Sequence, residues 1–198
     1  MGQRSQIYVR YNLCDGKDKK GLIARYFQWN FSERMISRAS YTMLHLKNLL
    51  STSGCLGDES VEKIIRVIDT NFDMKDVLIS DDILKNKRKF YDEYRNKIFF
   101  EQDNNDGQLF IDVTSGEIKY CFMKYYNEGK PMTAKEYMEW QRGVNWEEPS
   151  KWFTREMIEC TRGNIETIDA IATKMTKEEL KIFLNDDYSH LLGSDEDF

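Results

Sequence analysis

Two segments near the start of the chain alternate apolar and polar residues with a period of two, and this pattern restricts the possible folds most. In residues 5–12, side chains such as Ile7 and Val9 fall on one face and polar ones on the other. Residues 22–29 form a second such segment, and residues 13–21 between them are rich in turn formers. Alternation of this kind is typical of half-buried strands. The sequence therefore predicts an N-terminal β-hairpin.

Helical periodicity follows the hairpin. Asn30 or Ser32 is positioned to cap a helix, and apolar residues then recur at spacings of three and four. This stripe consists of Ile36, Ala39, Met43, Leu46 and Leu50. A second helix is predicted after Asp58 or Ser60, with isoleucines and valines facing inward. For residues 69–84 the pattern does not separate a strand from a helix, and 85–97 resembles a charged helix.

A second set of strands is predicted in the middle of the chain. The apolar run at residues 98–100 precedes a turn signal that ends at Gly107, and further strand-like runs cover 109–113 and 118–126. These segments predict a three-stranded meander. The expected fold class is α+β, with a mostly antiparallel sheet from the N-terminal hairpin and this meander, packed with several helices.

The last third of the chain has helical patterns. Thr133 with Glu136 and Thr176 with Glu179 are capping-box sequences. Helices are predicted after Thr133 and at about 150–160, 164–174 and 176–186, with a break at 143–149. We expect residues 1–130 to form an α+β core with two hairpins, residues 131–192 a helical region packed on it, and residues 193–198 an acidic tail.

Composition restricts the class of protein. The 198 residues are 40% hydrophobic with 2 prolines, which favours packed structure over disorder. No run reaches the roughly 18 apolar residues of a membrane helix, and the start has no apolar signal core, so we expect a cytoplasmic protein. Because the 4 cysteines form no C-x-x-C pair, free thiols are expected, with a disulfide framework left open.

Tests for known chemistry are largely negative. The sequence has 2 histidines and no locally spaced zinc ligands, P-loop, dinucleotide-binding or nucleophile-elbow motif. The turn at Gly107 lacks two carboxylates that an EF-hand needs. Asp69, Asp73, Asp76, Asp81 and Asp82 are the best candidates for an unmarked acidic enzyme site, though a solvated acidic face explains them as well. We therefore predict no catalytic residues, no metal and no cofactor. These absences favour a protein that is not an enzyme, with an unmarked enzyme site left open.

The first 50 residues carry 9 Lys and Arg against 3 Asp and Glu, whereas the rest of the chain holds 20 against 31. On the first helix, Arg34, Arg38, Tyr41 and His45 recur at helical spacing opposite the apolar stripe. The hairpin adds further cations and aromatics beside this helix. The predicted partner-binding residues are Arg4, Arg10, Arg25, Trp29, Arg34, Arg38, Tyr41 and His45.

Four uses of this basic and aromatic surface remain open. It can pair with the chain's own acidic part, bind a protein through Arg, Tyr and Trp, bind nucleic acid, or bind a small anionic ligand. The acidic region 178–198 offers the converse, a surface that imitates a polyanion. A sequence pI of about 5.3 weighs against nucleic acid.

Residues 1–11 (MGQRSQIYVRY) and 24–39 (ARYFQWNFSERMISRA) resemble a family of uncharacterised proteins from phages, prophages and mobile elements of Gram-positive gut bacteria. The similarity extends more loosely to 69–78 and 105–113. The resemblance implies a setting in which small proteins often act on host machinery, including as inhibitors of CRISPR nucleases. It supplies no catalytic residues. The resulting hypothesis is a non-enzymatic protein that binds a host protein and inhibits a defence nuclease, with nucleic-acid binding and a metal-dependent enzyme as alternatives.

Overall fold

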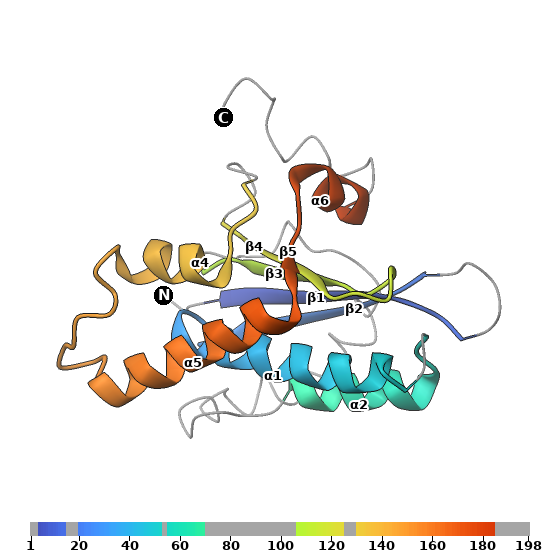
Figure 1. Cartoon of the computed structure of the whole chain (residues 1–198), viewed down its shortest axis with the longest axis horizontal. Helices are drawn as coiled ribbons and strands as arrows, with labels where there is room; N and C mark the ends of the chain where they lie inside the picture. The colour runs from blue at the N-terminus through green and yellow to red at the C-terminus, as the bar shows by residue number, and fades with distance from the viewer. Residues whose placement is uncertain (1–3, 15–19, 53–54, 70–105, 125–129, 185–198) are drawn as a thin grey trace.

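The N-terminal hairpin lies at one edge of a five-stranded sheet (Figure 1). The computed structural model describes residues 4–14, 20–52, 55–69, 106–124 and 130–184. Its strands are β1 (Arg4–Asn12), β2 (Lys20–Gln28), β3 (Gln108–Asp112), β4 (Lys119–Met123) and β5 (Thr173–Lys174). Its helices are α1 (Glu33–Leu50), α2 (Asp58–Ile68), α4 (Ala134–Arg142), α5 (Arg155–Ile171) and α6 (Lys177–Leu184).

The sheet is mixed, with strand order β2-β1-β3-β4-β5. β1 pairs antiparallel with β2, and β3 pairs antiparallel with β4, as predicted for hairpins. β1 and β3 run parallel, with Gln6 opposite Gln108, and β4 and β5 also run parallel. The predicted α+β class is therefore confirmed, with antiparallel and parallel pairings in alternation across the sheet.

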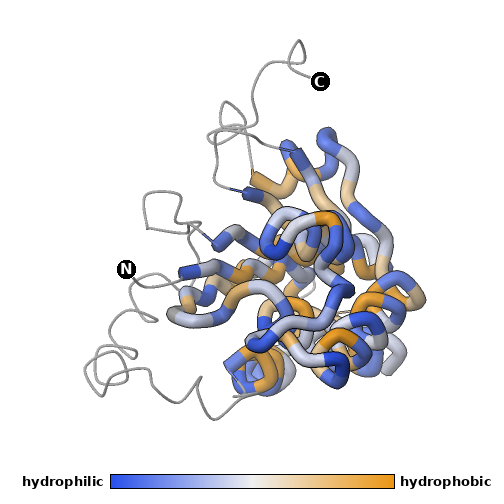
Figure 2. Tube along the Cα trace, turned by 90° about the vertical axis from the view of Figure 1, so that its left-hand side faces the viewer, coloured by the Kyte–Doolittle hydropathy of each residue, from blue (hydrophilic) through white to orange (hydrophobic). Residues whose placement is uncertain are grey.

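The two faces of the sheet are covered differently. In Figure 1, α1, α2 and α5 lie on one side of the strands and α6 lies on the other. Side chains from α1, α2, α4 and α5 form one core cluster with the strand residues that alternate with Tyr8, whereas Tyr8 itself belongs to a second cluster with α6. Figure 2 shows apolar and polar stretches alternating along the chain, as expected where each element buries one face.

Several helix boundaries follow the predicted signals. α4 begins after Thr133, whose hydroxyl accepts from the Glu136 N–H at 3.1 Å, while the Glu136 carboxylate accepts from the Thr133 N–H at 2.6 Å. The equivalent pair at Thr176 and Glu179 precedes α6. Both capping boxes are therefore confirmed. The predicted helices at 150–160 and 164–174 are instead one helix, α5, followed by the short strand β5.

Gly107 turns the chain into β3. Its φ is +96°, and a Cβ placed there would lie 3.0 Å from the Met123 carbonyl oxygen. Both facts require glycine at this position.

Some of the sequence-based predictions lie outside the described residues. These are the strand at 98–100, the helix-like segment 85–97, the tail 193–198 and four of the five candidate acids, all but Asp69.

Cys14 and Cys55 form a disulfide, which corrects the expectation of free thiols at these two positions. The backbone brings them together, because Leu13 and Leu56 form a parallel bridge and the Leu56 N–H donates to the Asn12 carbonyl at 3.0 Å. Cys121 and Cys160 are free.

Within the described ranges, none of the helices has the length and apolarity needed to cross a bilayer.

Candidate functional site: the surface at the start of α1

The predicted partner-binding residues do not form one surface. Arg10 lies on the α6 face of the sheet, where its guanidinium is 4.4 Å from the centre of the Phe183 ring and donates to the Ile182 carbonyl at 3.1 Å. Arg25 lies on the opposite face, as its register partner Ile7 does. Successive strand residues point to opposite sides of a sheet, so these two arginines are separated by the sheet itself. Burial of Arg10 lowers the pKa of its guanidinium, and Asp112 partly offsets this effect.

Arg25 and Arg38 are also buried, with 3% and 2% of their surface exposed. The Arg25 Nε lies 3.4 Å from the Asp69 carboxylate at the end of α2. Arg38 donates to the Asn30 Oδ1 at 2.9 Å and to the Ile68 carbonyl, and it stacks on Phe27 at 4.5 Å. The expectation that Arg38 lies on an exposed polar face is wrong, because the end of α2 covers this flank of α1.

Apart from Arg4, the remaining predicted residues lie just before α1 or on its outer side. Trp29 and Tyr41 are 38% and 45% exposed, and Arg34 and His45 are partly exposed. Burial lowers the pKa of His45, and the ammonium of Lys63 on α2 lowers it further. Arg4, the first residue of the inner strand β1, is partly buried, and its backbone N–H donates to Asp106 at 2.6 Å.

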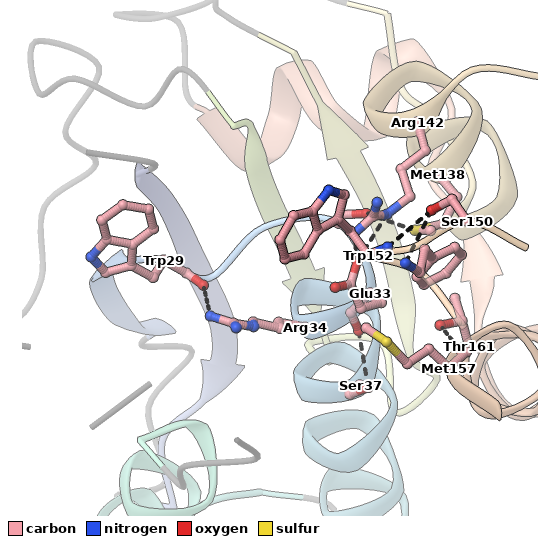
Figure 3. A network of polar contacts seen from close by, with 12 residues as sticks. Trp29, Glu33, Arg34, Ser37, Met138, Arg142, Ser150, Trp152, Met157 and Thr161 are labelled. Atoms are coloured by element: carbon pink, nitrogen blue, oxygen red, sulfur yellow. Dashed lines mark hydrogen bonds and ion pairs between the residues drawn. The ribbon is translucent and has the colours of Figure 1, made fainter. Parts of the chain in front are cut away.

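Figure 3 shows the side chains around the first turn of α1, where Trp29 and Arg34 form one contact and Glu33 and Arg142 another. We call Trp29, Glu33, Arg34, Arg142 and Trp152 the α1 entry surface. The Arg34 guanidinium donates to the Trp29 carbonyl at 3.1 Å. Arg142, at the end of α4, holds the Glu33 carboxylate with bonds of 2.5 and 3.0 Å. The acid in this surface is therefore neutralised by a partner of its own chain.

Trp152 is the most exposed tryptophan of the surface, at 76%. It lies between α4 and α5, where the Ser150 hydroxyl accepts from the backbone N–H groups of Trp152 and Phe153. Phe153 is buried and packs under the Arg142 guanidinium at 4.2 Å. Phe153 anchors this segment, and its neighbour Trp152 faces outward. The Lys151 ammonium lies 4.9 Å from the centre of the Trp152 ring.

The backbone before α1 is strained. Trp29 has φ 62° and Ser32 has φ 52°, a region that residues with a Cβ rarely adopt. Asn30 between them is fixed, because its carbonyl accepts from the Ser5 hydroxyl at 2.5 Å. These conformations cost about 1–3 kcal/mol each and persist only where surrounding contacts impose them.

Ser32 is held by α4. Its N–H donates to the Tyr137 hydroxyl at 3.3 Å, and its own hydroxyl accepts from Arg142 at 2.6 Å. Tyr137 is fully buried, which raises the pKa of its phenol. Ser32 precedes α1 but makes no side-chain cap, since its hydroxyl is used by Arg142 instead. The strained segment 29–32 is thus held by β1 through Ser5 and by α4 through Tyr137 and Arg142, and Trp29 lies at the surface.

Sequence reasoning identified Trp29 and Arg34 but not Glu33, Arg142 or Trp152. No local pattern indicated Trp152, because the preceding run 143–150 contains another tryptophan, Trp146, which is buried. The Glu33–Arg142 pair spans 109 residues, and nothing local indicates it.

The α1 entry surface suits binding better than catalysis. Its one carboxylate is paired, and its exposed groups include two indole rings, of which that of Trp152 lies beside the Lys151 ammonium. Across the part of the chain that the structure describes, His, Cys, Asp and Glu residues form no group of three or more able to hold a metal. Comparisons with protein-family models, with curated proteins and with solved structures find no match for this chain.

Proposed function

We propose that this chain is a non-enzymatic binding protein that docks onto another protein through the α1 entry surface. The observation that carries the proposal is the exposure of two tryptophans, Trp29 at 38% and Trp152 at 76%, on a surface that also contains Arg34. Tryptophan and arginine are the residues most enriched among those that dominate binding energy at protein interfaces. Apolar groups that gather on one exposed surface often mark an interaction site.

The way these rings are held also supports binding. Trp29 lies in the strained backbone segment that precedes α1, whose neighbouring residues are held by hydrogen bonds. Trp152 is next to Phe153, which is buried and anchors its segment. A side chain positioned before the partner arrives loses less conformational freedom on binding, which favours affinity. A complementary partner would offer apolar pockets for the two indoles and carboxylates near Arg34 and Lys151.

The identity of the partner rests on the resemblance to proteins of phages and mobile elements. On that ground we propose a protein of the bacterial host, in the host cytoplasm, and specifically a defence nuclease of the CRISPR type that the chain would inhibit. A nuclease that is inhibited by the wild type and not by a variant altered at the α1 entry surface would support this assignment. Unchanged nuclease activity with the wild type, across representative CRISPR effectors of Gram-positive bacteria, would remove it.

The docking surface itself is tested by photo-crosslinking. A benzophenone amino acid placed at position 29 or 152 is expected to capture one protein from a Gram-positive bacterial lysate. The same group at position 182 is the control, because Ile182 on α6 is 67% exposed and lies on the other side of the sheet. The Trp29→Ala and Trp152→Ala exchanges should weaken capture of that protein, and Ile182→Ala should not. Capture that is equal at all three positions, or from no position, would contradict the proposal.

Nucleic-acid binding is the second candidate, because the Lys151 ammonium lies beside the exposed Trp152 ring and Arg34 bonds the backbone of exposed Trp29. Cations near exposed aromatic rings can bind phosphates while the rings stack on bases. It ranks lower because Arg10, Arg25 and Arg38 are buried and cannot neutralise phosphates. Binding of a single-stranded oligonucleotide at low salt that weakens steeply as salt rises, and is lost in Trp152→Ala, would reverse this order.

The third alternative, a metal-dependent enzyme, relied on acids of residues 69–82. Of these, Asp69 is described, and its carboxylate lies against buried Arg25. An acid that pairs with an internal arginine has a structural role, so this alternative loses one of its candidates. A metal-dependent enzymatic activity of the wild type that is lost in Asp73→Asn and Asp76→Asn, with folding retained, is the result that would restore this alternative.

A further inference from the structure

The Cys14–Cys55 disulfide joins two parts of the chain that are already held together without it. Cys14 follows β1, and Cys55 lies three residues before α2, with their Cα atoms 5.2 Å apart. The neighbouring residue Leu56 is completely buried, and its N–H donates to the Asn12 carbonyl. The two sulfurs would therefore remain close if the bond between them were broken.

The two cysteine residues differ in exposure. Cys14 is exposed, whereas Cys55 is only partly exposed. Thiol–disulfide exchange depends on which sulfur an incoming thiolate can reach. An external thiolate therefore attacks the sulfur of Cys14, and Cys55 leaves as the thiolate. In the reverse direction, the nearby Cys55 thiolate resolves a mixed disulfide at Cys14.

The fold does not depend on this bond for its core. Packed side chains from the sheet and from α1, α2, α4 and α5 form one cluster, and a chain of 198 residues buries enough surface to fold without staples. The far end of α2 is held independently, because Asp69 lies against Arg25 and the Ile68 carbonyl accepts from Arg38. At the start of α2 the disulfide adds a covalent tie to β1, beside the packing of Val61 and Ile64 in this cluster.

We propose that Cys14–Cys55 is a reversible thiol–disulfide exchange site, and that its reduction loosens the first half of α2 while the sheet stays folded. The reductant is a dithiol, either a small molecule or a protein of the thioredoxin type. Its first thiolate forms a mixed disulfide with Cys14 and releases the Cys55 thiolate, which takes up a proton. Its second thiol then closes the reductant's own disulfide and releases Cys14. Two electrons and two protons pass to the chain, and one dithiol is oxidised.

The test uses the two other cysteines as internal references. The oxidised full-length protein is equilibrated with ratios of reduced to oxidised dithiothreitol, quenched, labelled with a maleimide and read by mass spectrometry. Cys160 is exposed and should be labelled at every ratio. Cys121 is fully buried, burial raises its thiol pKa, and it should be labelled only on unfolding.

The expected result is joint labelling of Cys14 and Cys55 at ratios where Cys121 remains unlabelled and circular dichroism is native. Labelling of Cys14 and Cys55 only together with Cys121 would show a structural staple and overturn the proposal. Labelling of the pair before any reductant is added would show that the bond does not form, and would overturn it equally.

Hydrogen exchange on the same wild-type samples locates the consequence. Backbone amides of residues 61–64, which begin with the Val61 N–H bonded to the Gly57 carbonyl, should exchange at least about tenfold faster after reduction, because local opening free energies follow the contacts that hold a segment. Amides of α4, at 134–142, should not change. A uniform change in both helices, or no change in either, would contradict the proposed local loosening.

The order of attack is tested with single variants. Cys55→Ser treated with oxidised glutathione should be glutathionylated at Cys14, at least about tenfold faster than Cys14→Ser is at Cys55. A faster reaction at Cys55 would reverse the assigned roles of the two sulfurs. The labelling and exchange experiments on the wild type stand even if either variant folds poorly.

Discussion

Arg38 carries a full charge and is buried between the sheet and the helices α1 and α2. Its contacts explain how this burial is tolerated. Its guanidinium reaches Asn30, the Ile68 carbonyl and the ring of Phe27, which together join the start of α1, the end of α2 and β2. Hydrogen bonds from a charged donor to buried acceptors contribute more than neutral ones. Arg38 therefore fastens three elements at one point.

Replacement of Arg38 by methionine keeps much of the side-chain volume but removes the donors. The Asn30 and Ile68 oxygens would then be buried without this partner, so we expect a loss of about 3 kcal/mol in the free energy of unfolding. Urea unfolding measures it. Arg34→Met, four residues earlier on the outer side, is the matched control and should cost about 0.5 kcal/mol or less. Equal losses for the two variants would contradict the buried role of Arg38.

His45 tests the packing of α2 against α1. Burial and the Lys63 ammonium both disfavour its protonated form, so its pKa lies below the ordinary 6.5. Since the folded state holds the neutral ring, this contribution to stability is present above pH 6.5 and is lost as the pH falls through the folded pKa. Lys63→Met should raise the pKa of His45 in an NMR titration, without restoring it fully, because burial is the larger cause.

The control for this titration is Lys135→Met on α4. Lys135 pairs with Glu139 at the i,i+4 spacing, just as Lys63 pairs with Glu59, but it lies on a different helix. The Lys135→Met exchange should leave the pKa of His45 unchanged. A shift of the same size in both variants would mean that overall charge, and not the contact between α2 and α1, sets the pKa.

At the scale of elements, the two capping boxes make helix starts sensitive to pH. The Glu179 pKa is lowered by the hydrogen bond from Lys119 and by that from the Thr176 N–H. For Glu136, burial acts to raise the pKa, but the Thr133 N–H and Lys174 outweigh it, and the pKa is also lowered. Both carboxylates therefore stabilise the fold above their ordinary value of 4.5, and this contribution is lost as the pH falls through their folded pKa values.

The double variant Glu136→Gln and Glu179→Gln should flatten this dependence. A glutamine can still accept the N–H bond of the capping box but has no charge to lose. Thermal unfolding between pH 6 and pH 3 should therefore show a smaller fall in melting temperature than in the wild type. The pair Glu159→Gln and Glu166→Gln, both exposed on α5, is the control and should retain the wild-type slope. An unchanged slope in the capping variant would contradict the role of these carboxylates.

Local signals predicted the elements well, and non-local contacts account for what was missed. The alternation at residues 5–12 and the boxes at Thr133 and Thr176 act within a few residues, so they can be identified in the sequence. The parallel pairing of β1 with β3 joins residues 102 apart, and no local pattern encodes it. For the site, helical spacing indicated the side of α1 that holds Arg34, but it could not show that α2 covers Arg38.

On the scale of the whole molecule, the sheet has a large helical layer on one face and α6 on the other. The contact of α6 centres on Phe183, which meets Phe110 edge-on at 5.3 Å and lies under the Arg10 guanidinium. Tyr8 stacks on Phe110 at 5.1 Å, so one aromatic group connects β1, β3 and α6. This small layer is what keeps the second face of the sheet covered among the described residues.

Adjacent residues of α6 provide a sharp test of this second layer. Phe183 is fully buried and Ile182 is 67% exposed, so the same exchange to alanine should have very different effects. Phe183→Ala removes a buried ring and leaves a cavity, and we expect about 3 kcal/mol of destabilisation in urea unfolding. Ile182→Ala should stay within about 0.5 kcal/mol of the wild type. If both variants changed stability equally, α6 would not be docked through Phe183, and Arg10 would lose the contact that explains its burial.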